Sequence, residues 1–247
     1  MNPNEIDTIK LTHKKNVLYI ILCSIFITHA IVAEIIGVKI FSLEQTLGTE
    51  NIPFLQGNFT AGVIIWPIVF IVSDIINEYF GKDGVRRISI ITACLIAYSF
   101  LIIFTATKLT PADFWLDVNK TDVDGNLFNI NSAYSSIFRQ GLGIIIGSIT
   151  AFLIGQLLDA YIFDKLKNVT GKKFFWLRST GSTLISQLID SFIVLWIAFY
   201  VFGNWSFQQL IDVATVNYIY KFVVAILLTP LLYVVHNLID KYLFSGE

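Results

Sequence analysis

The sequence predicts an all-α integral membrane protein that crosses the bilayer six times. Of its 247 residues, 55% are hydrophobic and only 14% are charged, whereas about 25% of the residues in a typical soluble domain are charged. The mean hydropathy is +0.70. The charged residues are unevenly spread and leave apolar stretches long enough to cross a hydrocarbon core of about 30 Å as helices.

Six apolar stretches meet this length, and we expect them to form one membrane domain covering residues 1–247. They lie near 17–38, 59–79, 85–108, 138–164, 179–202 and 210–236. The first stretch follows Lys14 and Lys15 and is not followed by a small-x-small cleavage site. We therefore expect an uncleaved first helix, preceded by a cytoplasmic tail at residues 1–16.

Proline and glycine residues mark particular points within three of these stretches. Pro67 lies in the second stretch and Pro230 in the sixth, and proline in a membrane helix predicts a kink. The fourth stretch contains Gly143, Gly147 and Gly155. Such small residues allow a neighbouring helix to approach closely.

The distribution of lysine and arginine predicts the orientation. Twelve of these residues fall on one side of the predicted membrane: Lys10, Lys14, Lys15, Lys82, Arg86, Arg87, Lys165, Lys167, Lys172, Lys173, Arg178 and Lys241. Four fall on the other side: Lys39, Lys108, Lys120 and Arg139. Because lysine and arginine are enriched in cytoplasmic loops, we expect both termini in the cytoplasm and the long loop 109–137 outside.

One group of polar residues lies at the predicted cytoplasmic ends of the helices. Its members are Asp74, Asn77, Glu78, Arg86, Arg87, Gln156 and Asp159. The spacing of Asp74, Asn77 and Glu78 places them on one helix face, and Arg86 and Arg87 follow the next turn as candidate partners. We interpret this group as a structural closure of the cytoplasmic end, with an inner gate as the alternative.

A second group lies deeper in the membrane and is the predicted substrate site. Its members are Glu34, Gln187, Asp190, Asn217 and Lys221. Gln187 and Asp190 share a face of the fifth helix, and Asn217 and Lys221 share a face of the sixth. Asp190 and Lys221 lie at similar depth on consecutive antiparallel helices, so we expect them to pair, because an unpaired charge is costly there.

Several function classes find no support in the sequence. It lacks the His-Glu-x-x-His, Gly-x-Ser-x-Gly and Walker motifs that mark common hydrolases and ATPases. Cys23 and Cys94 are too far apart for a metal motif, and no basic patch with interleaved aromatic residues indicates nucleic-acid binding. We expect no catalytic residues, metal or cofactor. Central polar groups in a six-helix membrane protein favour a transporter.

The segment "FIVSDIINEYFGKDGVRR", which starts at residue 70, resembles the hallmark segment of the queuosine precursor transporter family, also called the vitamin-uptake-like family. Three later blocks resemble that family in the same order: "GQLLDAYIFDKLK", "FFWLRSTGSTLISQLIDSFIVLWIAF" and "VNYIYKFVVAILLTPLLYVV". The resemblance covers about residues 59–235. The positions that match the family blocks are Asp74, Gln156, Asp159, Asp190, Lys221 and Pro230.

The resemblance implies a bacterial inner-membrane importer of 7-deazaguanine precursors of queuosine, a modified tRNA base. It also implies a six-helix fold similar to the substrate-binding subunits of energy-coupling-factor transporters. Glu34 departs from the amide expected at its position. Two other readings stay open: a substrate-binding subunit that needs separate ATPases, and a membrane scaffold that transports nothing. The sequence does not indicate whether the protein forms a homo-oligomer or binds coupling subunits.

Overall fold

A computed structural model describes residues 3–48, 58–139, 141–171 and 174–244. Within these ranges, five helices are long enough and apolar enough to cross a membrane. They are α1 (Pro3–Ile36), α3 (Trp66–Ala106), α6 (Leu142–Thr170), α7 (Phe175–Leu195) and α8 (Phe207–Phe244). The predicted helical membrane architecture is confirmed. Residues 3–16, expected as a tail, are the helical beginning of α1.

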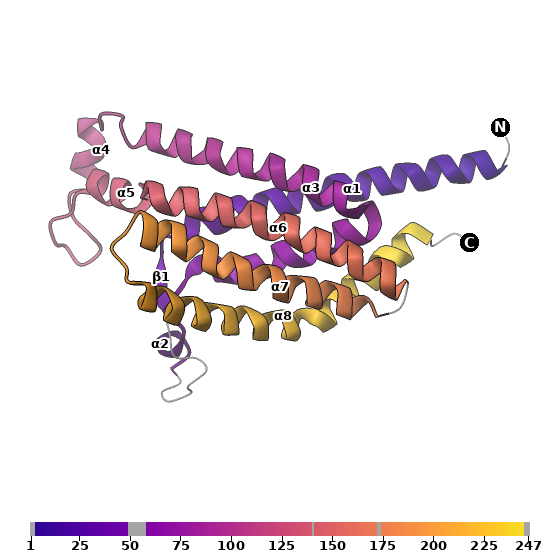
Figure 1. Ribbon diagram of the computed structural model, residues 1–247. Helices are drawn as coiled ribbons and strands as arrows, with labels where there is room; N and C mark the ends of the chain where they lie inside the picture. Colours follow the sequence, from indigo (N-terminus) through magenta and orange to yellow (C-terminus); the bar gives the residue numbers. More distant parts are fainter. Residues whose placement is uncertain (1–2, 49–57, 140, 172–173, 245–247) are drawn as a thin grey trace.

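Helix α3 contains the second and third predicted stretches, joined without a loop. Gly81 has φ 73° and ψ 175°, a backbone region that is essentially restricted to glycine. The helix therefore breaks into a first arm, residues 66–80, and a second arm, residues 82–106. In Figure 1, α3 begins near β1 and ends near α4, at the same end of the molecule. The two arms therefore run in opposite directions.

The segment before α3 differs from the prediction, which began a membrane helix near residue 59. Strands β1 (Ile40–Ser42) and β2 (Asn58–Thr60) form an antiparallel pair, followed by the 3-10 helix η1 (Ala61–Ile64). Pro67 lies in the first turn of α3, where its missing N–H breaks no helical hydrogen bond. The kink predicted at Pro67 is therefore wrong, whereas Pro230 does lie inside α8.

Three short helices lie outside the membrane-length helices. Helix α2 (Leu43–Leu47) follows β1, and its first turn is capped by the Ser42 side chain, which accepts a hydrogen bond from the Gln45 amide. The predicted outer loop contains α4 (Asp113–Val118) and α5 (Ile130–Phe138). Within the described residues the protein is therefore mostly helical, with one small hairpin that the all-α prediction missed.

The predicted close approach at the glycines of α6 is confirmed. A Cβ added at Gly147 would lie 3.1 Å from the Val194 carbonyl oxygen, so a side chain there would force α6 and α7 apart. A Cβ added at Gly143 would lie even closer to the Phe202 Cβ, just beyond the π-helical segment η2 (Trp196–Val201) that ends α7. Gly155 faces Asp190, with 3.5 Å between the added Cβ and the Asp190 Cβ.

The long helices pack side by side in the order α1, α3, α6, α7 and α8. The main apolar core lies where α1, α3 and α6 meet, and its most buried members include Phe26, Ile75, Val85 and Phe163. Figure 1 shows the beginning of α1 and the end of α8 at the same end of the molecule. The opposite end carries the β-hairpin, α4 and α5.

Candidate functional site

A cavity of about 1170 Å³ lies among the long helices. Its wall includes residues of α1, α3, α6, α7 and α8, together with Phe59 and Thr60 of β2. On α8 the lining runs from Asp212 to Leu232, which corresponds to about 30 Å at 1.5 Å per residue. The cavity therefore extends through a depth similar to that of a membrane core.

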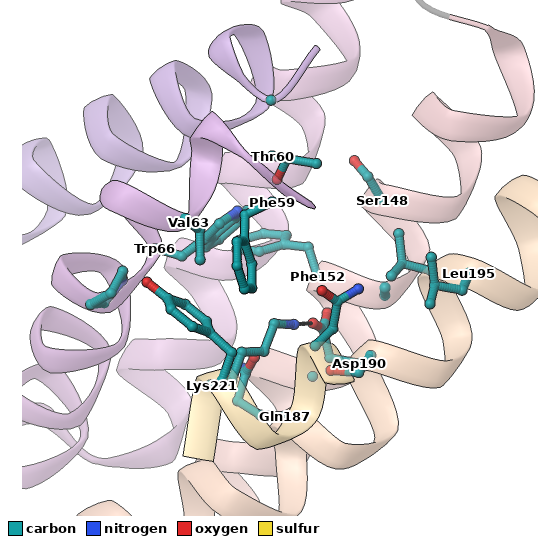
Figure 2. A pocket seen from close by; sticks show the side chains of 18 of the residues that line it. Phe59, Thr60, Val63, Trp66, Ser148, Phe152, Gln187, Asp190, Leu195 and Lys221 are labelled. Carbon is teal, nitrogen blue, oxygen red and sulfur yellow. Dashed lines mark hydrogen bonds and ion pairs between the residues drawn. The ribbon is translucent and has the colours of Figure 1, made fainter. Parts of the chain in front are cut away.

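The ion pair predicted between Asp190 and Lys221 is present at the cavity wall. Lys221 Nζ lies 2.5 Å from Asp190 Oδ2 and donates a hydrogen bond to it. Figure 2 shows this contact as a dashed line between Lys221 of α8 and Asp190 of α7. The Lys221 and Asp190 side chains are 24% and 19% exposed, so the cavity keeps both charges partly accessible.

The two amides predicted beside this pair, Gln187 and Asn217, also line the cavity. Gln187 lies one turn before Asp190 on α7 and is 3% exposed. Its Oε1 is buried and accepts no hydrogen bond within the described part of the chain. A buried acceptor without a donor is costly, so a ligand N–H group directed at Gln187 would satisfy it.

Glu34, the fifth predicted site residue, reaches the same cavity from α1. The Ser148 hydroxyl, from α6, donates a hydrogen bond to Glu34 Oε2. The sequence prediction did not include Ser148, because a single serine in an apolar helix has no distinguishing pattern. The cavity thus brings together Glu34 and the four other residues of the predicted substrate site.

Aromatic side chains cover the cavity near the β-hairpin. The Phe59 and Tyr220 ring centroids are 4.6 Å apart, and those of Trp66 and Phe152 are 5.8 Å apart. Figure 2 shows Phe59 projecting from β2 toward the space above Lys221. Sequence reasoning missed these rings because the chain contains 36 Phe, Tyr and Trp residues, and most of them pack or face lipid.

The far end of the cavity reaches part of the group assigned to the cytoplasmic end. Asp74 and Gln156 both belong to the lining. The Ser73 hydroxyl donates to Gln156 Oε1 over 2.8 Å, and the Ser179 hydroxyl donates to Asp74 Oδ2. Asp159 does not line the cavity but accepts a hydrogen bond from the Ser186 hydroxyl over 3.1 Å.

The partners predicted for Glu78 are wrong. Arg178 Nη2 lies 2.8 Å from Glu78 Oε1, and Lys167 Nζ lies 3.2 Å from Glu78 Oε2. Arg86 and Arg87 are exposed on the second arm of α3. The reversal at Gly81 brings the second arm back beside the first, but no ion pair among the described residues involves Arg86 or Arg87.

Arg178 was counted among the loop residues, yet it is 2% exposed within α7. It also donates to the Gly171 carbonyl over 2.7 Å. Asn77, the residue before Glu78, donates through Nδ2 to the Ala160 carbonyl of α6 over 3.1 Å. This end of the molecule is therefore fastened by contacts among α3, α6 and α7.

Residues 60–235 match the family model described as "Putative vitamin uptake transporter". The chain belongs to this family. The resemblance found in the sequence is thereby confirmed, and the matched range contains Gln187, Asp190, Asn217 and Lys221, whereas Glu34 lies outside it. With five apolar helices of membrane length, this vitamin uptake transporter family member is a multi-pass protein of the bacterial inner membrane.

Three curated relatives of this family member carry more specific names. The chain is 28% identical over 189 residues to the "Probable queuosine precursor transporter" of Haemophilus influenzae, covering 74% of this chain and 71% of the relative. It is 26% identical over 183 residues to the protein of that name from Bacillus subtilis, covering 74% and 73%. It is 26% identical over 186 residues to the "Queuosine precursor transporter" of Escherichia coli, covering 74% and 76%. No solved structure matches significantly.

Proposed function

We propose that this protein imports queuosine precursors, 7-deazaguanine bases such as 7-cyano-7-deazaguanine, across the bacterial inner membrane. The observation that carries the proposal is the cavity that extends through the helices and contains the Asp190–Lys221 pair. The names of the three relatives supply the substrate class. In this proposal the protein is a carrier and not an enzyme, and it uses no cofactor or metal.

The chemistry of a deazaguanine suits the groups that line the cavity. Its guanidine-like edge offers N–H donors, for which the Asp190 carboxylate and the unpaired Gln187 oxygen are acceptors. Its carbonyl oxygen requires a donor such as Lys221 or Asn217. The aromatic rings of Phe59 and Tyr220 provide an apolar surface for the flat face of the ring.

The proposal includes the topology expected from the sequence. The two arms of α3 each cross the membrane, which gives six crossings, and both termini lie in the cytoplasm. The shared position of the beginning of α1 and the end of α8 supports this arrangement, as does the excess of lysine and arginine at that side. The helix count is similar to that of energy-coupling-factor substrate-binding subunits.

An uptake assay in a bacterium that cannot make the precursor and lacks its own transporter tests the function. The readout is the queuosine content of tRNA after 7-cyano-7-deazaguanine is supplied. We expect this chain to restore queuosine, Asp190→Asn to abolish the restoration, and Asp124→Asn, in the exposed outer loop, to leave it unchanged. A strain in which the wild-type chain reaches the membrane without restoring queuosine would refute the proposal.

Transport measured with the purified protein in proteoliposomes separates a stand-alone importer from a subunit of a larger system. We expect uptake by proteoliposomes that contain only this chain. Ligand binding without uptake would instead identify a substrate-binding subunit that needs coupling partners. Absence of both binding and uptake would favour the scaffold reading.

A further inference from the structure

Asp74 and Asp159 form a carboxyl pair between α3 and α6 at the inner end of the cavity. Their exposed fractions are 3% and 4%, so both carboxyl groups are removed from solvent. Beside them, the Ser73 hydroxyl donates to Gln156 and the Asn77 amide donates to the Ala160 carbonyl, so α3 and α6 are in direct contact at the level of the two carboxyl groups. Burying two carboxylates side by side is unfavourable, because each loses hydration and each repels the other.

Among the residues that the structure describes, no cation forms an ion pair with either carboxyl group, Asp74 or Asp159. The nearby charged groups are Glu78 of α3, Lys167 of α6 and Arg178 of α7, and these bind one another. From α8, this end of the cavity meets Thr229 and Leu232, which do not titrate.

The hydrogen bonds around the carboxyl pair leave one of its oxygen atoms without a partner among the described residues. The Ser179 hydroxyl donates to Asp74 Oδ2, and the Ser186 hydroxyl donates to Asp159 Oδ1. Asp74 Oδ1 is buried and has no hydrogen-bond partner within the described residues. Because ionised carboxylates only accept hydrogen bonds, the two groups can bond to each other only when one of them carries a proton.

We propose that the Asp74–Asp159 pair is a proton-binding site that couples import of the base to inward movement of one proton. The inference rests on the proposed function for its transport step. Asp74 connects the site to the cavity, since it belongs to the lining, whereas Asp159 lies behind it. A proton that enters through the cavity therefore reaches the pair at Asp74.

Release of the proton changes the contacts that close the inner end. With the proton bound, one hydrogen bond joins α3 to α6, and the serines of α7 hold both carboxyl groups. Without it, two adjacent negative charges repel each other at the junction of these three helices. The proton passes to cytoplasmic water as the inner end opens, the repulsion between the two carboxylates then keeps the junction apart, and the base leaves on the same side.

Infrared spectroscopy of the purified protein tests the proton site without any substrate. We expect the C=O stretch of a protonated carboxyl group at neutral pH in the wild type, and its loss in both Asp74→Asn and Asp159→Asn. These replacements keep the shape of the side chain and remove the shared proton. Asp124→Asn is the matched control, and its spectrum should equal that of the wild type.

Proteoliposomes test the coupling. An inward proton gradient should raise the initial uptake of 7-cyano-7-deazaguanine several-fold in the wild type, and a protonophore should remove the increase. Asp159→Asn should still exchange external for internal base, but its rate should not respond to the gradient.

The outcomes for the coupling inference and the proposed function are distinguishable. Wild-type uptake that ignores the gradient, or an unchanged carboxyl band in both variants, overturns the proton inference and leaves the importer function intact. Failure of the wild type to bind or carry the base overturns the proposed function and, with it, the coupling. If Asp159→Asn cannot be produced in folded form, Asp74→Asn and the wild-type gradient response still decide the question.

Discussion

Substitutions at the Asp190–Lys221 pair can show whether the pair binds the ligand or only holds α7 and α8 together. Removing one partner of a fully buried ion pair costs about 3–5 kcal/mol, whereas an exposed pair contributes about 0–1 kcal/mol. The two side chains are 24% and 19% exposed, which places this pair between those limits. We expect Asp190→Asn or Lys221→Gln alone to lower the free energy of unfolding by about 2–3 kcal/mol.

The double variant Asp190→Asn/Lys221→Gln should recover most of this stability, because neither remaining group carries a buried unpaired charge. Its ligand binding should not recover. Replacing a hydrogen bond to a charged group by a neutral one costs about 1–1.5 kcal/mol. Two such replacements, about 2–3 kcal/mol together, weaken affinity by about 30- to 140-fold.

Thermal unfolding in detergent and binding of 7-cyano-7-deazaguanine measure the two quantities separately. The exposed pair Lys82–Asp164, with 3.1 Å between Nζ and Oδ2 and side chains 53% and 29% exposed, is the matched control. Asp164→Asn should change stability by less than about 1 kcal/mol and leave affinity unchanged. Wild-type affinity in the folded double variant would refute the binding role and leave only a clamp between α7 and α8.

Three further predictions concern topology and packing. In a cysteine-free background, Asp122→Cys should react with a membrane-impermeant reagent in intact cells and Lys165→Cys should not; equal labelling would overturn the orientation. Gly81→Ala should destabilise the protein by about 1–3 kcal/mol, measured by thermal unfolding, because its φ is positive; an unchanged unfolding temperature would contradict this. Arg178→Ala should reduce folded yield strongly by leaving Glu78 without its main partner, whereas Arg86→Ala should not, and equal yields would refute the assignment.

The sequence predicted those features that follow from depth and helical spacing. The apolar runs located the long helices, and counting 1.5 Å per residue from their ends placed Asp190 and Lys221 at the same level. Gln187 and Asn217 followed from spacing along the same faces. These predictions depend only on position along a helix, and consecutive antiparallel helices are neighbours.

Features that depend on the rotation of one helix against a distant one were not predictable in this way. Glu78 pairs with Arg178, a hundred residues later in the chain, and not with the arginines just beyond the turn. The β-hairpin was also missed, because residues 59–64 are as apolar as the helix that follows them. The cavity itself arises from several helices and has no local signature.

The single-residue connection at Gly81 has a mechanical consequence. With no loop between them, the two arms of α3 share one pivot, and the first arm behaves as a lever. Trp66, at the far end of this arm, lies fifteen residues from Gly81, or about 22 Å along a helix. A tilt of about ten degrees at the pivot displaces Trp66 by about 4 Å, so a small rotation at one end of the molecule reshapes the aromatic wall of the cavity at the other.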